Sequence, residues 1–170
     1  MNKKVIQLLV DNTSGVLSRI SNLFSRRGYN IESITAGVTA DPRFTRITIV
    51  TSGDNTVLEQ IEKQVEKLVD VRNVKVLEPD SSVYRELCLV KVACDSTNRN
   101  DIMLFAENIF HGKIVDVTTK SIVVEVTGKQ TTIEAFLNML DGYEILELAR
   151  TGIAGLRRGT DDIVYPKFNY

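Results

Sequence analysis

The chain has 170 residues, of which 43% are apolar and 25% are charged, as is ordinary for globular proteins. Its formal net charge of -1 creates no basic field that would attract nucleic acid or an anionic membrane surface. No stretch reaches the ~20 apolar residues that a membrane-spanning helix needs, and the apolar part of MNKKVIQLLVDN is too short for a signal peptide.

The first part of the chain shows the periodicities of four strands and two helices. Apolar residues recur on one helix face from Val16 to Phe24 and again from Val57 to Val69, and Gly28 suits the left-handed end of the first helix. Strands are indicated at 4–10, 34–38, 47–49 and 71–77, with a turn at 40–44. The order βαββαβ predicts an α+β, ferredoxin-like domain over residues 1–77.

The same order recurs after a plausible linker at 78–83. Helices are expected at 102–110, ended by Gly112, and at 133–140. Strands are expected at 84–94, 114–118, 122–127 and 145–149. The pattern predicts a second ferredoxin-like βαββαβ domain over 84–158, followed by a C-terminal tail at 159–170.

The first strand is apolar on both of its faces. Val5 and Leu9 lie on one face, and Ile6, Leu8 and Val10 lie on the other. The two helices of such a domain cover only one face of the sheet, so another element must cover the second. A partner subunit would do so, which favours at least a dimer. Packing of the two domains against each other is the competing explanation.

No pattern in the sequence indicates a catalytic centre. His111, the one histidine, follows a predicted helix, where histidine more often interacts with the last carbonyl groups than acts as a base. Asp161 and Asp162 are weak candidates for paired carboxylates because they lie in the tail. The motifs GxSxG, HExxH and CxxC are absent. We therefore predict no catalytic residue and no metal ligand, and infer that the chain alone is not an enzyme.

The two cysteines, Cys88 and Cys94, fall in one apolar, strand-like stretch without metal-ligand spacing. We interpret them as buried free thiols, which is typical of a protein in a reducing cytoplasm.

The stretch DNTSGVLSRI, residues 11–20, joins the first strand to the first helix. It is not a Walker loop, because no GxxxxGK[ST] pattern is present. The N-terminus of the helix would suit one carboxylate, Gly15 would allow close approach, and the amide oxygen of Asn12 could accept from an ammonium group. These features favour an amino-acid ligand. Simple capping of the helix by Asp11, Asn12, Thr13 or Ser14 explains the loop equally well.

A second group of candidate residues lies in RRGYNIESI, residues 26–34. In a ferredoxin-like domain Asn30 and Ile31 lie at the far end of the first helix from Gly15. One subunit therefore cannot readily bring both ends to one small ligand. A two-fold dimer with antiparallel first helices would place Asn30 of one chain beside Gly15 of the other.

The segment LLVDNTSGVLSRISNLFSRRGYNIESITAG closely resembles the start of the bacterial acetolactate synthase (acetohydroxyacid synthase) small regulatory subunit. Two further stretches, LEQIEKQVEKLVDV at 58–71 and ELARTGIAGLRRG at 147–159, resemble the same family. The similarity runs in order from about residue 4 to residue 159. It is weaker at 95–145 and does not include the tail.

The resemblance implies that residues 1–77 form an ACT domain, an amino-acid-sensing module, which dimerises and binds a branched-chain amino acid, usually valine. It implies effector contacts from Asn12, Gly15, Val16 and Leu17 of one subunit and from Asn30 and Ile31 of its partner. Many ACT domains have proline before the glycine, whereas this chain has Ser14.

The family's catalytic chain is a separate subunit that condenses pyruvate with pyruvate or 2-oxobutyrate. The resemblance implies that thiamine diphosphate, Mg²⁺ and FAD are bound by that partner and that this chain holds no cofactor. The expected function is to activate the catalytic subunit and to confer feedback inhibition in valine, leucine and isoleucine biosynthesis.

Two other classes of function stay open. The chain could be a stand-alone ACT sensor that regulates transcription or another enzyme, although it lacks a visible basic face or DNA-binding element. It could also be an enzyme that uses His111 or Cys94. Turnover of pyruvate by the pure chain with the cofactors would support the latter.

Overall fold

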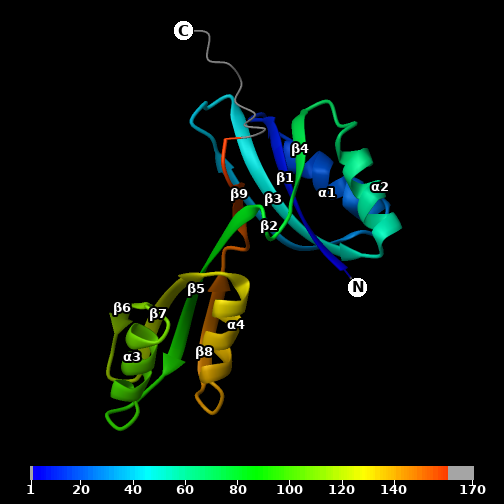
Figure 1. The fold of residues 1–170 in the computed structure, drawn as a ribbon. Coiled ribbons are helices and arrows are strands. Elements are labelled where there is room, and N and C mark those ends of the chain that lie inside the picture. The colour runs from blue at the N-terminus through cyan, green and yellow to red at the C-terminus, as the bar shows by residue number, and fades with distance from the viewer. Residues whose placement is uncertain (1, 161–170) are drawn as a thin grey trace. The chain divides into compact units, whose positions relative to one another are not determined.

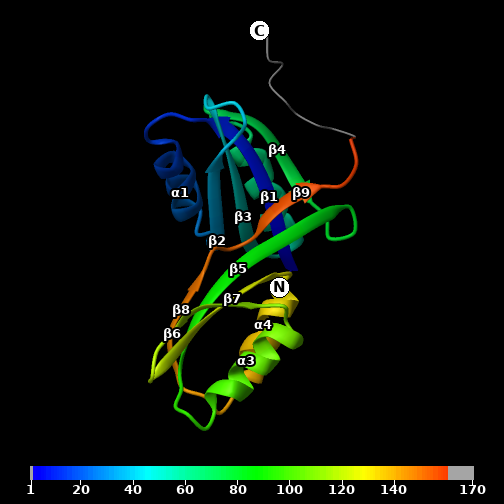
Figure 2. The same ribbon diagram turned by 90° about the vertical axis from the view of Figure 1, so that its left-hand side faces the viewer.

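The computed structural model describes residues 2–160 (Figures 1 and 2). Within that range the chain forms two compact units. The first comprises the residues up to Val83 together with those from Ile153 onward, and the second comprises Tyr84–Gly152.

The first unit is a four-stranded antiparallel sheet with two helices on one face (Figure 1). Its elements follow the predicted order: β1 (Asn2–Asp11), α1 (Val16–Arg26), β2 (Asn30–Val38), β3 (Phe44–Gly53), α2 (Asn55–Val65) and β4 (Val71–Leu77). The strand order is β2-β3-β1-β4, so β2 and β4 form the two edges. This arrangement places the end of β1 and the start of α1 beside the start of β3.

The core of the first unit follows from the two periodicities. Alternate residues of β1 and β3 face the helices, and one stripe of each helix is buried against them. The members of this core include Ile6, Leu8, Val10, Val16, Ile20, Phe24, Ile47, Ile49, Leu58, Ile61 and Val65. The prediction extended the second helix to Val69, which is wrong: the chain leaves the helix after Val65 in i→i+3 turns, and Val69 is exposed.

The opposite face of the first sheet is covered by a short strand that sequence analysis did not predict. β9 (Ala154–Arg157) pairs with β5 (Ser82–Ala93), whose first residues belong to the first unit. The side-chain amide of Gln7 in β1 donates to the backbone oxygen of Gly155 at 2.6 Å. Arg158 N–H donates to the oxygen of Ser81 at 2.8 Å. Residues 153–158, expected in the second domain, therefore lie with the first unit.

The second unit repeats the same arrangement. Its sheet has the order β6-β7-β5-β8, and its remaining elements are α3 (Arg99–Asn108), β6 (Lys113–Val117), β7 (Ser121–Gly128), α4 (Gln130–Met139) and β8 (Ile145–Arg150). Its core includes the rings of Phe110 and Phe136, with centroids 5.2 Å apart. The predicted α+β fold with two ferredoxin-like units is confirmed.

The chain after α3 differs from the prediction that Gly112 ends this helix. The residue with left-handed backbone is His111, at φ 52°. Gly112 is needed for another reason: a Cβ at this position would lie 2.9 Å from the backbone oxygen of Glu125 and 3.2 Å from that of Ala106. Its lack of a side chain therefore allows the turn to pack closely on β7.

No helix within residues 2–160 is long and apolar enough to cross a membrane. Cys88 and Cys94 are both buried and free, as predicted, and burial raises the pKa of the Cys88 thiol.

Candidate functional site

The loop between β1 and α1 is anchored at Asp11, the last residue of β1. Asp11 N–H donates to the oxygen of Asp70 at 2.9 Å. The Asp11 carboxylate accepts from the guanidinium of Arg72, with one oxygen 2.7 Å from Nε, and this hydrogen bond lowers the pKa of Asp11. The anchor ties the start of the loop to the segment that enters β4.

Asn12 is held by the hairpin between β2 and β3. Its backbone N–H donates to the oxygen of Arg43 at 2.7 Å, and its side-chain Nδ2 donates to the oxygen of Pro42 at 2.8 Å. The Asn12 Oδ1 accepts from the Thr45 hydroxyl at 3.1 Å. An amide oxygen has two lone pairs, so one acceptor position of Asn12 remains for a ligand.

The tip of this hairpin is itself rigidly organised. Asp41 is 4% exposed, and its carboxylate accepts from Arg43 Nη2 at 2.6 Å and from Arg43 N–H at 3.0 Å. The bonds from Arg43 lower the pKa of Asp41. The carbonyl groups that hold Asn12 thus come from a turn with a fixed geometry.

Gly15, rather than a polar side chain, is the N-cap residue of α1. It has φ 86°, in the left-handed region where glycine is favoured, and within the described chain no side chain caps the first turn. Arg19 N–H donates to Gly15 O at 3.0 Å as the first helical bond. Capping by Asp11, Asn12, Thr13 or Ser14 therefore does not account for the loop, and the first-turn N–H groups stay available to a ligand.

A pocket of about 260 Å³ lies beside this uncapped helix end. It is lined by backbone and side chains of the loop and by apolar residues of α1 and β3, including Asn12, Gly15, Val16, Leu17, Thr45 and Ile47. One end of the pocket therefore offers N–H donors and the positive end of a helix dipole. The other wall is apolar, so the arrangement suits a small anion that carries an aliphatic group.

Four of these pocket residues, Asn12, Gly15, Val16 and Leu17, were predicted from the sequence, whereas Thr45 and Ile47 were not. The missing signal was the pairing of β1 with β3, in which Val10 lies opposite Thr45 and Leu8 opposite Ile47. Ile47 was assigned to a strand and Thr45 to no element, and no motif linked a residue at position 45 to the loop at position 12.

The other two predicted residues, Asn30 and Ile31, lie away from this pocket in the same chain. Asn30 is opposite Ser52 in the β2–β3 pair, whereas Asn12 contacts Thr45 at the other end of β3. At about 3.3 Å per residue, Thr45 and Ser52 are roughly 23 Å apart. A ligand the size of an amino acid cannot contact Asn12 and Asn30 of one chain.

An apolar surface borders the pocket along β2, which is an edge strand. Ile34 and Val38 lie opposite Ile49 and Thr45 and so share the helix-covered face of the sheet. Both are exposed, as is Leu17 on α1 at 49%. An exposed apolar edge of this kind is a surface on which a further strand can pair.

The corresponding loop of the second unit has a different chemistry. The Asp95 carboxylate accepts from the backbone N–H groups of Thr97 at 2.7 Å and Asn98 at 3.3 Å. Arg99 stands at the first position of α3 and donates to the oxygen of Thr119. A negative side chain thus binds N–H groups of the loop before α3, whereas within the described residues no such bond is made in the loop before α1.

The other chemical candidates do not assemble into a centre. Within residues 2–160 no three of the His, Cys, Asp and Glu side chains group closely enough to hold a metal ion. Asp161 and Asp162 lie outside the described residues.

Two family models match most of the chain. Residues 6–73 match one described as an AHAS small subunit-like ACT domain. Residues 85–159 match one described as the small subunit of acetolactate synthase.

Individual proteins match over nearly their whole length. The probable acetolactate synthase small subunit of Methanothermobacter thermautotrophicus is 48% identical over 92% of this chain and 93% of that protein. The acetolactate synthase isozyme 3 small subunit of Escherichia coli is 46% identical over 92% and 96%. The crystal structure of the acetolactate synthase small subunit from Thermotoga maritima superposes with a TM-score of 0.85, at 39% identity, over 94% of this chain and 99% of that one.

Proposed function

We propose a function for this chain, which belongs to the family of acetolactate synthase small subunits. The chain activates a separate catalytic subunit and lowers its rate when a branched-chain amino acid fills the pocket at the start of α1. Thiamine diphosphate, Mg²⁺ and FAD belong, in this proposal, to the catalytic subunit.

The uncapped start of α1 is the observation that carries the effector site. An effector carboxylate would accept from the first-turn N–H groups, close to the glycine backbone at Gly15. The effector's ammonium group would donate to the free lone pair of Asn12 Oδ1, and its aliphatic group would pack on Val16, Leu17 and Ile47. The hydrogen bonds that fix Asn12 orient its oxygen before the ligand arrives, which reduces the entropy cost of binding.

A second copy of the chain completes the site. Pairing along the β2 edges would bury the exposed Leu17, Ile34 and Val38 and extend the sheet. A two-fold axis would then bring Asn30 and Ile31 of one chain to the pocket of the other chain. Within one chain these two residues are too far from the pocket to contact the same ligand. The dimer is therefore part of the binding site and not only a means of covering apolar surface.

Regulation requires that the effector binds with different affinity to the free chain and to the chain that is bound to the catalytic subunit. Couplings of this kind are typically about 1–3 kcal/mol, and the effect on binding is reciprocal. We expect the catalytic subunit to change the affinity of this chain for valine by some factor. Valine should change the affinity of this chain for the catalytic subunit by the same factor.

The direct test combines this chain with an acetolactate synthase catalytic subunit of the same organism. Acetolactate formation from pyruvate is measured with the cofactors, with and without the chain, and with valine, leucine or isoleucine. Activation that is reversed by at least one of them supports the proposal. Equal rates with and without the chain would refute it, and turnover by this chain alone would show that it is an enzyme.

The proposed site is tested by Gly15→Asp, which places a negative charge where the effector carboxylate would lie. Valine inhibition of the reconstituted enzyme should be lost while activation survives. The matched control is Gly15→Asn, because asparagine has the same size and also tolerates the left-handed backbone of this position. Valine inhibition of the Asp variant similar to that of wild type would show that the site lies elsewhere. Equal loss of valine inhibition in both variants would show that the backbone at Gly15, and not the added charge, is responsible.

A further inference from the structure

The edge strand β8 of the second unit is unusually open. All six of its residues are exposed, and Ile145, Leu146 and Leu148 are apolar. β8 pairs with β5 on one side only and ends the sheet on the other. Natural edge strands are commonly protected by charged side chains that discourage pairing.

The two charged residues of β8 both form ion pairs with residues of β5. The Glu147 Oε2 lies 2.7 Å from Lys91 Nζ. Arg150 donates from Nε and Nη2 to the two carboxylate oxygens of Glu86, at 2.7 and 2.8 Å. The Glu86 side chain is 5% exposed, whereas the side chains of Arg150 and Glu147 are 30% and 71% exposed. The other side chains of β8 are aliphatic, so the open edge carries exposed aliphatic groups beside one exposed carboxylate that is already paired.

The backbone of β8 has donors and acceptors that point outward. Thr151 N–H donates to the oxygen of Leu87 at 3.0 Å, so residues 87 and 151 form a hydrogen-bonded pair. Such pairs alternate along an antiparallel ladder, which makes Ala149 and Glu147 bond to β5 and turns the N–H and C=O of Leu148 away from it. An added strand would find these groups free within the described chain.

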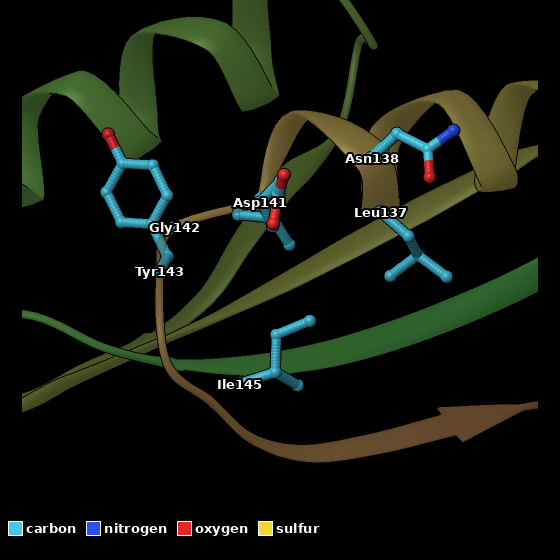
Figure 3. A pocket seen from close by; sticks show the side chains of 7 residues that line it. Leu137, Asn138, Asp141, Gly142, Tyr143 and Ile145 are labelled. Carbon is cyan, nitrogen blue, oxygen red and sulfur yellow. The ribbon is translucent and has the colours of Figure 1, made fainter.

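A hollow of about 430 Å³ lies at the start of this strand. Figure 3 shows Leu137 of α4 and Ile145 of β8 extending toward the same space, with Asp141 on the loop between the two elements. Tyr143 points instead toward α3, where the centroid of its ring lies 6.0 Å from the centroid of the Phe105 ring. The hollow is therefore lined by aliphatic side chains together with polar groups of the loop.

The loop beside this hollow is acidic. Asp141 and Glu144 are both exposed, and within residues 2–160 neither forms an ion pair. An open edge strand with exposed aliphatic side chains and negative charge at one end is an arrangement suited to recognition by strand addition. The complementary ligand is an extended segment with one aliphatic side chain and a neighbouring lysine or arginine.

We propose that the β8 edge is the docking site for such a basic and aliphatic segment of the catalytic subunit. This inference rests on the proposed function, which supplies the identity of the partner. A second copy of β8 does not fit the same role, because its one basic side chain, Arg150, is held by Glu86 and cannot neutralise Asp141 or Glu144.

The test uses the full chain with Leu148→Lys, which puts a charge on the outer strand. The matched control is Val117→Lys on β6, the opposite edge of the same sheet, because Val117 and Leu148 are 46% and 45% exposed. The concentration of small subunit that gives half-maximal activation of the catalytic subunit should rise about tenfold or more for Leu148→Lys and should be unchanged for Val117→Lys.

A second pair of variants tests the charge requirement. Asp141→Lys should raise the half-maximal concentration, whereas Glu107→Lys on the exposed part of α3 should not. Valine binding by the free chain, measured by calorimetry, should be the same in all four variants, because the effector pocket is in the first unit. The far-ultraviolet circular dichroism spectrum and the thermal unfolding of each variant, compared with wild type, show that its second unit is folded.

The outcomes separate the two proposals. Normal activation by Leu148→Lys and Asp141→Lys would overturn the docking site while leaving the proposed function in place. If the free Leu148→Lys variant forms a smaller oligomer than wild type in solution while Val117→Lys does not, β8 mediates contact between copies of the chain. That result would also overturn the docking site. Failure of the wild-type chain to activate would refute the proposed function and, with it, this inference.

Discussion

Asn12 illustrates how a single side chain is prepared for a ligand by residues far from it in sequence. Three hydrogen bonds, from its backbone N–H and both ends of its amide, attach it to Pro42, Arg43 and Thr45. The residue is exposed, so these bonds do more to fix its orientation than to bury it. Pre-orientation is what a binding site gains from such a network.

Asn30→Ala is a residue-scale test of the shared effector site. If the amide contacts the buried part of the effector, valine binding should weaken by roughly 1–3 kcal/mol. The native stability should change little, because the Asn30 side chain is exposed and the residue contributes its backbone oxygen to Thr51. Calorimetry with Asn100→Ala, an exposed asparagine on α3, as the control measures both effects. Unchanged valine affinity would remove Asn30 from the site.

The Asp11–Arg72 pair predicts a pH-dependent contribution to stability. The folded-state pKa of Asp11 is lowered chiefly by its hydrogen bond to Arg72. A lowered pKa stabilises the fold above the unfolded-state value, about 3.9 for aspartate, and this stabilisation is lost as the pH falls through the folded-state value.

Arg72→Ala should therefore lower the free energy of unfolding at pH 7, and the gap to wild type should narrow below about pH 4. Urea denaturation at pH 7 and pH 3 measures this gap. Arg85→Ala is a suitable control, because the Arg85 guanidinium donates to a backbone oxygen, that of Tyr84. An equal gap at both pH values for Arg72→Ala would show that the carboxylate is not involved.

At the scale of elements, α1 illustrates how a helix can be assigned correctly while the capping of its first turn stays undecided. The spacing of Val16, Ile20 and Phe24 predicts the buried stripe that the structure contains. Four polar residues precede the helix, yet Gly15 is the N-cap and none of them caps it. Their side chains are directed by contacts such as that of Asp11 with Arg72, which the local sequence does not reveal.

The turn after α3 provides a prediction about packing between elements. Gly112→Ala should destabilise the second unit by about 1–3 kcal/mol, because the new Cβ would press on the backbone of β7 and α3. Gly37→Ala on β2 is the control, since a Cβ there meets no atom within 4 Å. Thermal unfolding of both variants compares them. A Gly112→Ala protein as stable as the control would show that the turn can move away.

At the scale of the whole molecule, the proposed site predicts complementation between two defective variants. Gly15→Asp and Asn30→Ala each damage one half of every site in their own dimers. A mixed dimer contains one site with both halves intact and one with both halves altered. If subunits exchange at random, about a quarter of all sites are intact, because half the dimers are mixed.

Valine binding to an equimolar mixture, measured after subunit exchange, should therefore recover to about a quarter of the wild-type number of sites. Each variant alone serves as its own control. No recovery in a mixture that is shown to exchange would mean that Gly15 and Asn30 do not contribute to one site across the dimer.

Periodicity was enough to predict the α+β fold and the two βαββαβ repeats. The alternation in β1 and the helix stripes state which residues are buried, and a βαββαβ order has few ways of burying them. The absence of capping at Gly15 and the positions of Thr45 and Ile47 beside the loop required the structure, because they depend on residues about 30 positions apart.

The order of residues along the chain dictates which faces are apolar, whereas the folded arrangement dictates what covers them. The sequence indicated that the second face of the first sheet needs a cover, but it left a partner subunit and the other domain as candidates. The structure places β9 there, through Gln7 and Gly155. A four-residue strand that contains glycine carries too little periodicity to predict, and its position follows from tertiary hydrogen bonds that no local pattern encodes.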